Sequence, residues 1–238
     1  MKFSRPLVRS TLVKRYKRFL SDHEQDDGTI VTAHCANPGA MLGLTEPGSE
    51  TWLSPTDNPQ RKLRYTWEMI RVEPGARGLV GINTTHPNGI VASAIQAGEV
   101  TELSGYANIR REVKYGQNSR VDILLEADGV PPCYVEVKNV HLMRRSGIAE
   151  FPDSVTKRGT KHLGELARVA EAGGTAVMFY LVQRGDCDSF ALASDIDPAY
   201  SEAIATARAR GIEALCYACA ISEEEIRLDR PLPVDRGR

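Results

Sequence analysis

Residues 119–140, SRVDILLEADGVPPCYVEVKNV, constrain the fold of this chain more than any other stretch. Two short runs rich in apolar and β-branched residues, 120–126 and 133–140, read as strands. Asp128, Gly129 and the two prolines at 131 and 132 lie between them, and such residues mark a turn. The stretch therefore predicts a β-hairpin.

Alternation along the second strand places Glu136 and Lys138 on one face and the intervening valines on the other, toward an apolar core. Asp122 lies on the first strand, where hairpin pairing brings it near Glu136 across the sheet. Two carboxylates and one ammonium group should therefore converge on a single surface.

These three side chains suit one kind of chemistry. Two carboxylates are hard oxygen ligands for Mg²⁺ or Mn²⁺, and the metal makes a bound water easier to ionise. Lys138 could orient that water or neutralise developing charge. Without a metal, repulsion should leave one carboxylate protonated. The alternative is a surface hairpin with a Glu–Lys pair and no site.

Asp122 followed by Glu136, Val137 and Lys138 resembles the core of metal-dependent nucleases written PD-(D/E)XK. Glu112, in the preceding segment IRREVKYG, is similar to a third acidic position often found in that group. The resemblance implies that Asp122 and Glu136 bind the metal, that Lys138 acts in catalysis, and that Glu112 is a candidate third acid.

Longer segments resemble the SfsA (sugar fermentation stimulation protein A) family: SRVDILL, CYVEVKNVHL, FPDSVTKRGTKHLGEL, HCANPGAMLGL and KRYKRFL. They are spread over nearly the whole chain. This resemblance implies an N-terminal OB-like barrel, non-specific DNA binding and a regulatory link to sugar (maltose) metabolism.

The N-terminal part, residues 1–84, reads as a small β domain. Strand-like pieces at 29–35, 50–53, 62–72 and 78–83 are separated by Gly, Pro and Asn turns, as in small barrels. Residues 7–20 read as one long strand, although helical spacing also fits them.

Basic residues gather near the start of the chain. Lys14, Arg15, Lys17 and Arg18 would present positive charge beside aromatic side chains, which suits binding of nucleic acid. The alternative is a solvated strand whose charges have no partner.

The C-terminal part, residues 85–238, alternates strands and helices. The sequence predicts three helices. The first spans 89–97, the second runs from an N-cap at Asp153 or Ser154 to residue 173, and the third spans 199–210. It predicts strands at 109–115, 175–183 and 212–219 and a loop over 143–152, with a peripheral tail. Together with the hairpin, this indicates a mixed α/β sheet of about five strands flanked by helices.

The second of these helices begins with three cations, Lys157, Arg158 and Lys161. This placement opposes the helix dipole, and a bound phosphate would compensate for it. The alternative is a solvated basic end in which Lys161 pairs with Glu165 one turn later.

Composition narrows the function classes. The 238 residues carry a net charge of −1, so any polyanion must bind at local patches. Five cysteines fit a reducing compartment, and the absence of an apolar run favours a cytoplasmic location without a membrane partner.

Three functions remain open. The first is a Mg²⁺- or Mn²⁺-dependent nuclease that acts on DNA or RNA. The second is a DNA-binding regulatory protein without turnover. The third is an enzyme of small phosphorylated metabolites. The chain shows no helix-turn-helix that would read a base sequence, so DNA binding should be non-specific.

Overall fold

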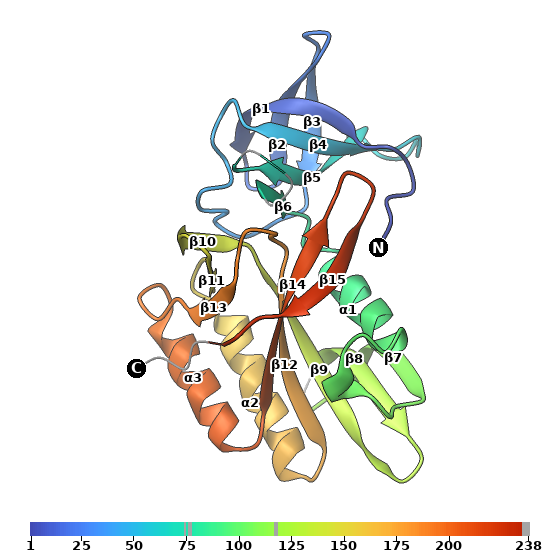
Figure 1. Cartoon of the computed structure of the whole chain (residues 1–238), viewed down its shortest axis with the longest axis vertical. Helices are drawn as coiled ribbons and strands as arrows, with labels where there is room; N and C mark the ends of the chain where they lie inside the picture. The colour runs from blue at the N-terminus through green and yellow to red at the C-terminus, as the bar shows by residue number, and fades with distance from the viewer. Residues whose placement is uncertain (74, 76–77, 117–118, 235–238) are drawn as a thin grey trace.

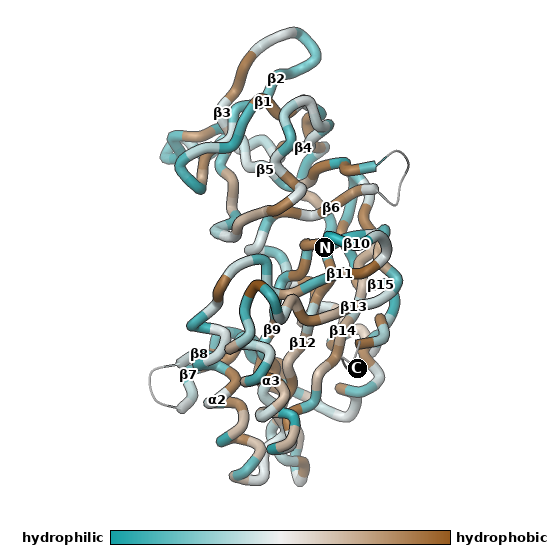
Figure 2. The backbone as a smooth tube through the Cα atoms, turned by 90° about the vertical axis from the view of Figure 1, so that its left-hand side faces the viewer, coloured by the Kyte–Doolittle hydropathy of each residue, from teal (hydrophilic) through white to brown (hydrophobic). Residues whose placement is uncertain are grey.

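A computed structural model describes residues 1–73, 75, 78–116 and 119–234. It has two parts stacked along the long axis, a β-barrel at one end and a twisted mixed sheet with helices at the other (Figures 1 and 2). The predicted architecture, a small N-terminal β-barrel followed by a mixed sheet flanked by helices, is confirmed.

The barrel has five strands: the first three form a meander, the fourth pairs with the first and the fifth, and parallel pairing of the third and fifth strands closes it. A short sixth strand extends it toward the second part of the molecule. The strands are β1 (Val8–Tyr16), β2 (Leu20–Gln25), β3 (Ile30–Cys35), β4 (Glu50–Pro55), β5 (Tyr65–Arg71) and β6 (Leu79–Gly81).

The single strand expected over residues 7–20 is wrong. Lys17 and Arg18 adopt positive φ angles of 48° and 64°, which reverses the chain. β1 and β2 then pair antiparallel with Tyr16 opposite Leu20. The cations at 17 and 18 therefore lie at the tip of a hairpin.

The second part is built on a six-stranded sheet in the order β15-β14-β12-β9-β8-β7. Its three central strands, β9, β12 and β14, pair parallel, and the β14–β15, β8–β9 and β7–β8 pairs are antiparallel. The strands are β7 (Asn108–Tyr115), β8 (Ser119–Ala127), β9 (Val130–Val140), β12 (Thr175–Val182), β14 (Glu213–Ile221) and β15 (Ile226–Pro231).

Two of these strands differ from expectation. β15 comes from the segment expected to be a peripheral tail, because Ile226 and Leu228 bury their side chains in the sheet domain. Pro131 and Pro132 lie inside β9 rather than in the turn. They fall where the β8–β9 register shifts, and a bulge tolerates the missing N–H groups.

Helices cover both faces of the sheet (Figure 1). Apolar residues of α1 (Pro87–Gln96) pack with Val135 and Val137 on one face. α2 (Lys157–Glu171) and α3 (Pro198–Ala209) pack on the other face. A 3₁₀ turn, η2 (Thr101–Leu103), follows α1. The side chain of Thr156 caps α2, so the expected cap at Asp153 or Ser154 is wrong.

A small third sheet forms where a loop over 143–152 was expected. β10 (Leu142–Arg145) pairs antiparallel with β11 (Ile148–Phe151), which pairs parallel with β13 (Ser189–Leu192). Strands of four residues leave too little local pattern to be recognised, and the partner of β11 in β13 lies about forty residues further along the chain.

The barrel and the sheet domain are joined by backbone hydrogen bonds. Gly81 N donates to Gln183 O at 2.9 Å, and Val80 forms an isolated bridge with Arg184. No helix in the described part of the chain has the length and apolar character needed to cross a membrane.

Candidate metal-binding site

The candidate residues lie where β8 and β9 separate. Regular pairing begins at Ile123 and Val135 and runs toward the turn. One residue further from the turn, Val137 N donates to Asp122 Oδ2 at 2.8 Å instead of to a backbone carbonyl. The carboxylate of Asp122 thereby accepts a hydrogen bond from the backbone of the neighbouring strand. Glu136 and Lys138 lie on the same face of β9, as the sequence predicts.

Glu136 is the most buried member of the group, with 2% of its surface exposed. Its Oε1 accepts hydrogen bonds from Lys138 Nζ at 2.7 Å and from His162 Nδ1. Its Oε2 is buried and has no hydrogen-bond partner among the described residues. A buried carboxylate oxygen without a partner is costly unless something else binds it.

Asp122 is held on both sides. Its Oδ1 accepts a hydrogen bond from Asn88 Nδ2 at 2.8 Å, and the same amide group lies 3.2 Å from Glu112 Oε1. Glu112 is exposed and has a positive φ of 54°. Asn88 therefore bridges the two acids, and the only sign of this role in the sequence is its place at a helix start.

The two central carboxylates have opposite pKa shifts. Burial and the negative charge of Glu136 raise the pKa of Asp122, against hydrogen bonds from Val137 N and Asn88. Burial also acts to raise the pKa of Glu136, but hydrogen bonds from His162 and Lys138 outweigh it and hold that pKa below its ordinary value. Asp122 is thus the carboxylate more easily protonated, as repulsion between the pair predicts.

Sequence reasoning missed the role of His162. Its side chain is buried on α2, Nδ1 faces Glu136, and Nε2 accepts a hydrogen bond from Arg158 Nε at 3.3 Å. Because Nε2 is an acceptor, the proton is on Nδ1 and is donated to the carboxylate. One sign of this role is present in the sequence: His162 is a polar residue one turn before Leu166, on the buried face of the helix.

The basic start of α2 is only partly solvated. Lys157 and Arg158 are exposed, while Lys161 Nζ lies 3.7 Å from Glu165 Oε1. The expected i,i+4 pair is therefore present. Glu165 is nearly fully buried, and its Oε2 has no partner within the part of the chain that is described.

The four N-terminal cations separate into two kinds. Arg15 donates from one guanidinium nitrogen to the carbonyls of Arg18, Asn37 and Gly39, at 2.9 to 3.1 Å. Lys14 lies 3.5 Å from Asp22. Lys17 and Arg18 are exposed at the hairpin tip. Arg15 thus supports the fold, and the tip residues face solvent.

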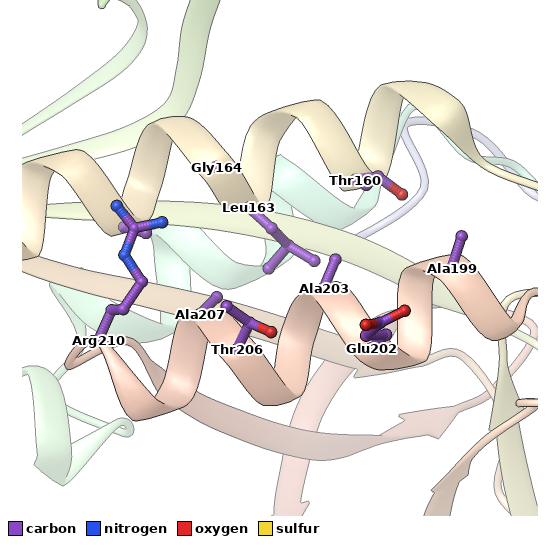
Figure 3. Close-up of a pocket in the computed structure, with 10 residues that line it drawn as sticks. Thr160, Leu163, Gly164, Ala199, Glu202, Ala203, Thr206, Ala207 and Arg210 are labelled. Atoms are coloured by element: carbon purple, nitrogen blue, oxygen red, sulfur yellow. The ribbon is translucent and has the colours of Figure 1, made fainter.

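A separate cavity of about 310 Å³ lies between α2 and α3 (Figure 3). Small side chains such as Gly164, Ala203 and Ala207 line it, with Arg210 at one end. Its lining, as far as the structure describes it, contains none of the candidate site residues.

The donor set at Asp122 and Glu136 fits a hard divalent cation. Within the described residues no three His, Cys, Asp or Glu side chains are arranged to hold a metal alone. Two carboxylates with water completing the shell are what Mg²⁺ accepts in proteins. The unpartnered Oε2 of Glu136 is the atom that a cation would satisfy.

Comparisons with known proteins match both parts of the chain to the same protein family. Residues 13–82 match the SfsA N-terminal OB domain, and residues 85–225 match the sugar fermentation stimulation protein RE domain. A sugar fermentation stimulation protein homolog of Paramagnetospirillum magneticum is 60% identical over 235 residues, covering 99% of this chain and 98% of the relative. A homolog of Rhodospirillum centenum is 56% identical, covering 98% of each.

A solved structure is similar along its whole length. The structure of Pyrococcus furiosus SfsA in complex with Ca²⁺ superposes with a TM-score of 0.87 at 25% identity, covering 99% of this chain and 98% of that one. The barrel, the mixed sheet and the matches over both parts lead to one conclusion: this chain belongs to the SfsA family of sugar fermentation stimulation proteins.

Proposed function

We propose that this protein binds DNA without sequence preference and cleaves it with a divalent metal, Mg²⁺ or Mn²⁺, at Asp122 and Glu136. The observation that carries the proposal is the buried Oε2 of Glu136, which has no partner among the described residues and lies beside a second carboxylate and the Lys138 ammonium. A surface that only bound phosphate would gain nothing from buried acids, which repel it.

Each residue has a distinct part. Asp122 and Glu136 hold the cation, which would polarise the phosphate and acidify a bound water. Lys138, with 15% of its side chain exposed, reaches the edge of the site and can neutralise charge on the phosphate. Glu112 is tied to Asp122 through Asn88 and can complete the acidic edge.

Nucleic-acid binding is assigned to two basic surfaces. In the first domain (residues 1–84), Lys17 and Arg18 at the hairpin tip contact phosphates, with Lys14 and Arg15 behind them. In the second domain (residues 85–238), Lys157, Arg158 and Lys161 at the start of α2 contact phosphates next to the site, where free N–H groups add positive potential. RNA has the same backbone charge and is the alternative substrate.

The Ca²⁺ bound by the Pyrococcus furiosus relative supports a divalent-cation site in this fold. Ca²⁺ and Mg²⁺ share oxygen ligands and differ in coordination number and rigidity. A link to sugar metabolism, which the name of the relatives suggests, would act through the DNA bound by the protein.

A second function is favoured by a specific contact. Both oxygens of Asp122 already accept protein hydrogen bonds, from Asn88 Nδ2 and Val137 N. A carboxylate held in this way can serve the fold alone, which would leave a DNA-binding protein without turnover. Each oxygen keeps a second lone pair, however, so these bonds and a cation are compatible.

Cleavage of labelled single- and double-stranded DNA and RNA in Mn²⁺, Mg²⁺ or EDTA tests the proposal. Wild type is compared with Asp122→Ala and Glu136→Ala, and Glu202→Ala, an exposed acid on α3, is the matched control. Metal-dependent cleavage lost in both site variants and kept in the control supports the nuclease. Absence of cleavage with DNA binding intact in all four proteins leaves the binding function.

A further inference from the structure

A cavity of about 240 Å³ lies between the two parts of the molecule. One wall is the barrel-domain loop at residues 37–39, and the other is the segment 151–156 that leads into α2. The two walls are tightly apposed: a Cβ on Gly39 would lie 2.4 Å from Asp153 Oδ2. Asp153 Oδ2 also accepts a hydrogen bond from Met41 N across the interface, at 3.2 Å.

His141 lines this cavity and is 95% buried, since 5% of its surface is exposed. Its Nδ1 accepts from Asn139 Nδ2 at 2.9 Å, so its proton is on Nε2. Nε2 lies 3.4 Å from Asp153 Oδ2 and makes no hydrogen bond to any described residue. The cavity wall therefore holds a buried donor that lacks a well-formed partner.

The charge of the cavity selects against a phosphate. Although burial acts to raise it, contacts with His141 and Met41 N lower the pKa of Asp153 to about 2. Asp153 is therefore an anion at neutral pH. An anion of this kind attracts N–H donors and repels phosphate oxygens.

Part of the remaining lining is apolar. Phe151, Pro152 and the side chain of Val155, which is 65% exposed, supply flat or aliphatic surface next to the polar pair. A carboxylate acceptor beside apolar walls matches the amino-bearing edge and the faces of a nucleobase. Bases are read in this way when they are splayed out of a stack.

The cavity lies next to the candidate metal-binding site and to the basic start of α2. Asn139 follows Lys138 of the candidate site along β9, about 3.3 Å further along the strand, with its side chain on the opposite face. Thr156 lines the cavity and caps α2, whose next residues are the exposed Lys157 and Arg158. A strand with one phosphate at these cations can therefore place an adjoining base in the cavity.

We propose that this interdomain cavity receives an unpaired nucleobase of the bound nucleic acid. The substrate class is then single-stranded or locally unpaired nucleic acid, because a base in a duplex cannot enter. The inference rests on the proposed binding of nucleic acid, and it concerns which form is bound rather than whether cleavage follows.

Filling the cavity from its exposed rim is the first test. Val155→Trp places a large side chain at the mouth, and Val130→Trp, at an exposed valine that begins β9, is the matched control. Affinity is measured by fluorescence anisotropy in Ca²⁺ with a labelled single-stranded DNA, the same strand made abasic, and a blunt duplex of equal length.

Val155→Trp is expected to weaken binding of the single strand about tenfold, the effect of losing one well-held base. Binding of the abasic strand and of the duplex should be unchanged, and Val130→Trp should have no effect. Equal losses for the single strand and its abasic form, or no loss for either, would overturn the proposal.

Asp153→Asn provides a second test that keeps the shape of the wall. Losing the carboxylate should reduce the preference for bases with amino groups, cytosine and adenine, over thymine in homopolymer binding. An unchanged ranking, with only a lower melting temperature, would show that Asp153 has a structural role alone. Cleavage by wild type without any effect of Val155→Trp would leave the proposed function standing and remove this inference.

Discussion

His162 on α2 donates a hydrogen bond through Nδ1 to Oε1 of Glu136, the same oxygen that Lys138 contacts on β9. One oxygen of the carboxylate is thus fully engaged, and the other is left without a partner in the described structure. This arrangement fixes the direction in which Glu136 presents its free lone pairs.

Removing the imidazole should weaken metal binding. We expect His162→Ala to lower Mn²⁺ affinity about tenfold, because partners behind a ligand orient it and keep it charged. His162→Asn can keep a donor near Nδ1 and should lose less. Isothermal titration of the DNA-free protein measures both, and equal affinity in all three proteins would contradict the role given to His162.

Without metal, the charged Asp122 carboxylate should lower the free energy of unfolding at neutral pH. Its pKa is raised by burial and by Glu136, so the folded state favours its protonated form and loses stability as pH rises through that pKa. We expect Asp122→Asn to unfold at higher urea than wild type at pH 7 in EDTA.

The order should reverse with metal present. At a Mn²⁺ concentration a hundredfold above the dissociation constant, wild type gains about 2.7 kcal/mol. Asp122→Asn, which lacks one ligand charge, should gain less. Lower stability of the variant in EDTA would show that the hydrogen bonds to Asn88 and Val137 N outweigh the charge penalty.

The hairpin tip of the barrel should contribute to DNA binding through charge alone. Removing Lys17 and Arg18 together should lower the slope of log affinity against log salt by roughly 2, one phosphate contact each. Arg208→Ala with Arg227→Ala removes equal charge from exposed positions on α3 and β15. A slope that stays at the wild-type value would exclude the tip from the interface.

His23 should make the barrel sensitive to mild acid. Its buried ring bonds Thr51 Oγ1 and Ser21 Oγ, and burial lowers its pKa from 6.5 to about 4. Between these values the unfolded chain binds the proton and the folded chain does not, so stability falls as pH falls.

The expected loss between pH 7 and pH 4 is at most about 3 kcal/mol from this group. Urea unfolding of wild type and His23→Gln at several pH values measures it, and the variant should show the smaller change. Parallel curves for the two proteins would mean that other groups dominate the acid response.

The sequence was most informative where the pattern is local. Alternation along residues 133–140 correctly placed Glu136 and Lys138 opposite the buried valines, because β9 is a regular strand. The position of Asp122 near Glu136 was predicted from the same hairpin pattern. The long apolar runs of β12 and β14 likewise marked the parallel centre of the sheet.

Contacts between distant segments could not be read in this way. Asp153 looks like a helix cap, but its carboxylate accepts from Met41 N, more than a hundred residues away, and Thr156 caps α2 instead. His162 faces Glu136 only because α2 packs on the sheet at one particular rotation. β15 was missed since its burial depends on a neighbouring strand and not on its own charged sequence.

The missing side chain of Gly39 has a consequence for motion. With Gly39 and Asp153 in such close approach, any hinge between the barrel and the sheet domain would have to break the Met41–Asp153 bond and the Gly81–Gln183 bond together. We therefore expect the surface between the barrel and the sheet domain to be formed before the ligand binds. The radius of gyration of the protein, measured by X-ray scattering, should barely change on binding. Selection among nucleic acids would then depend on the flexibility of the ligand.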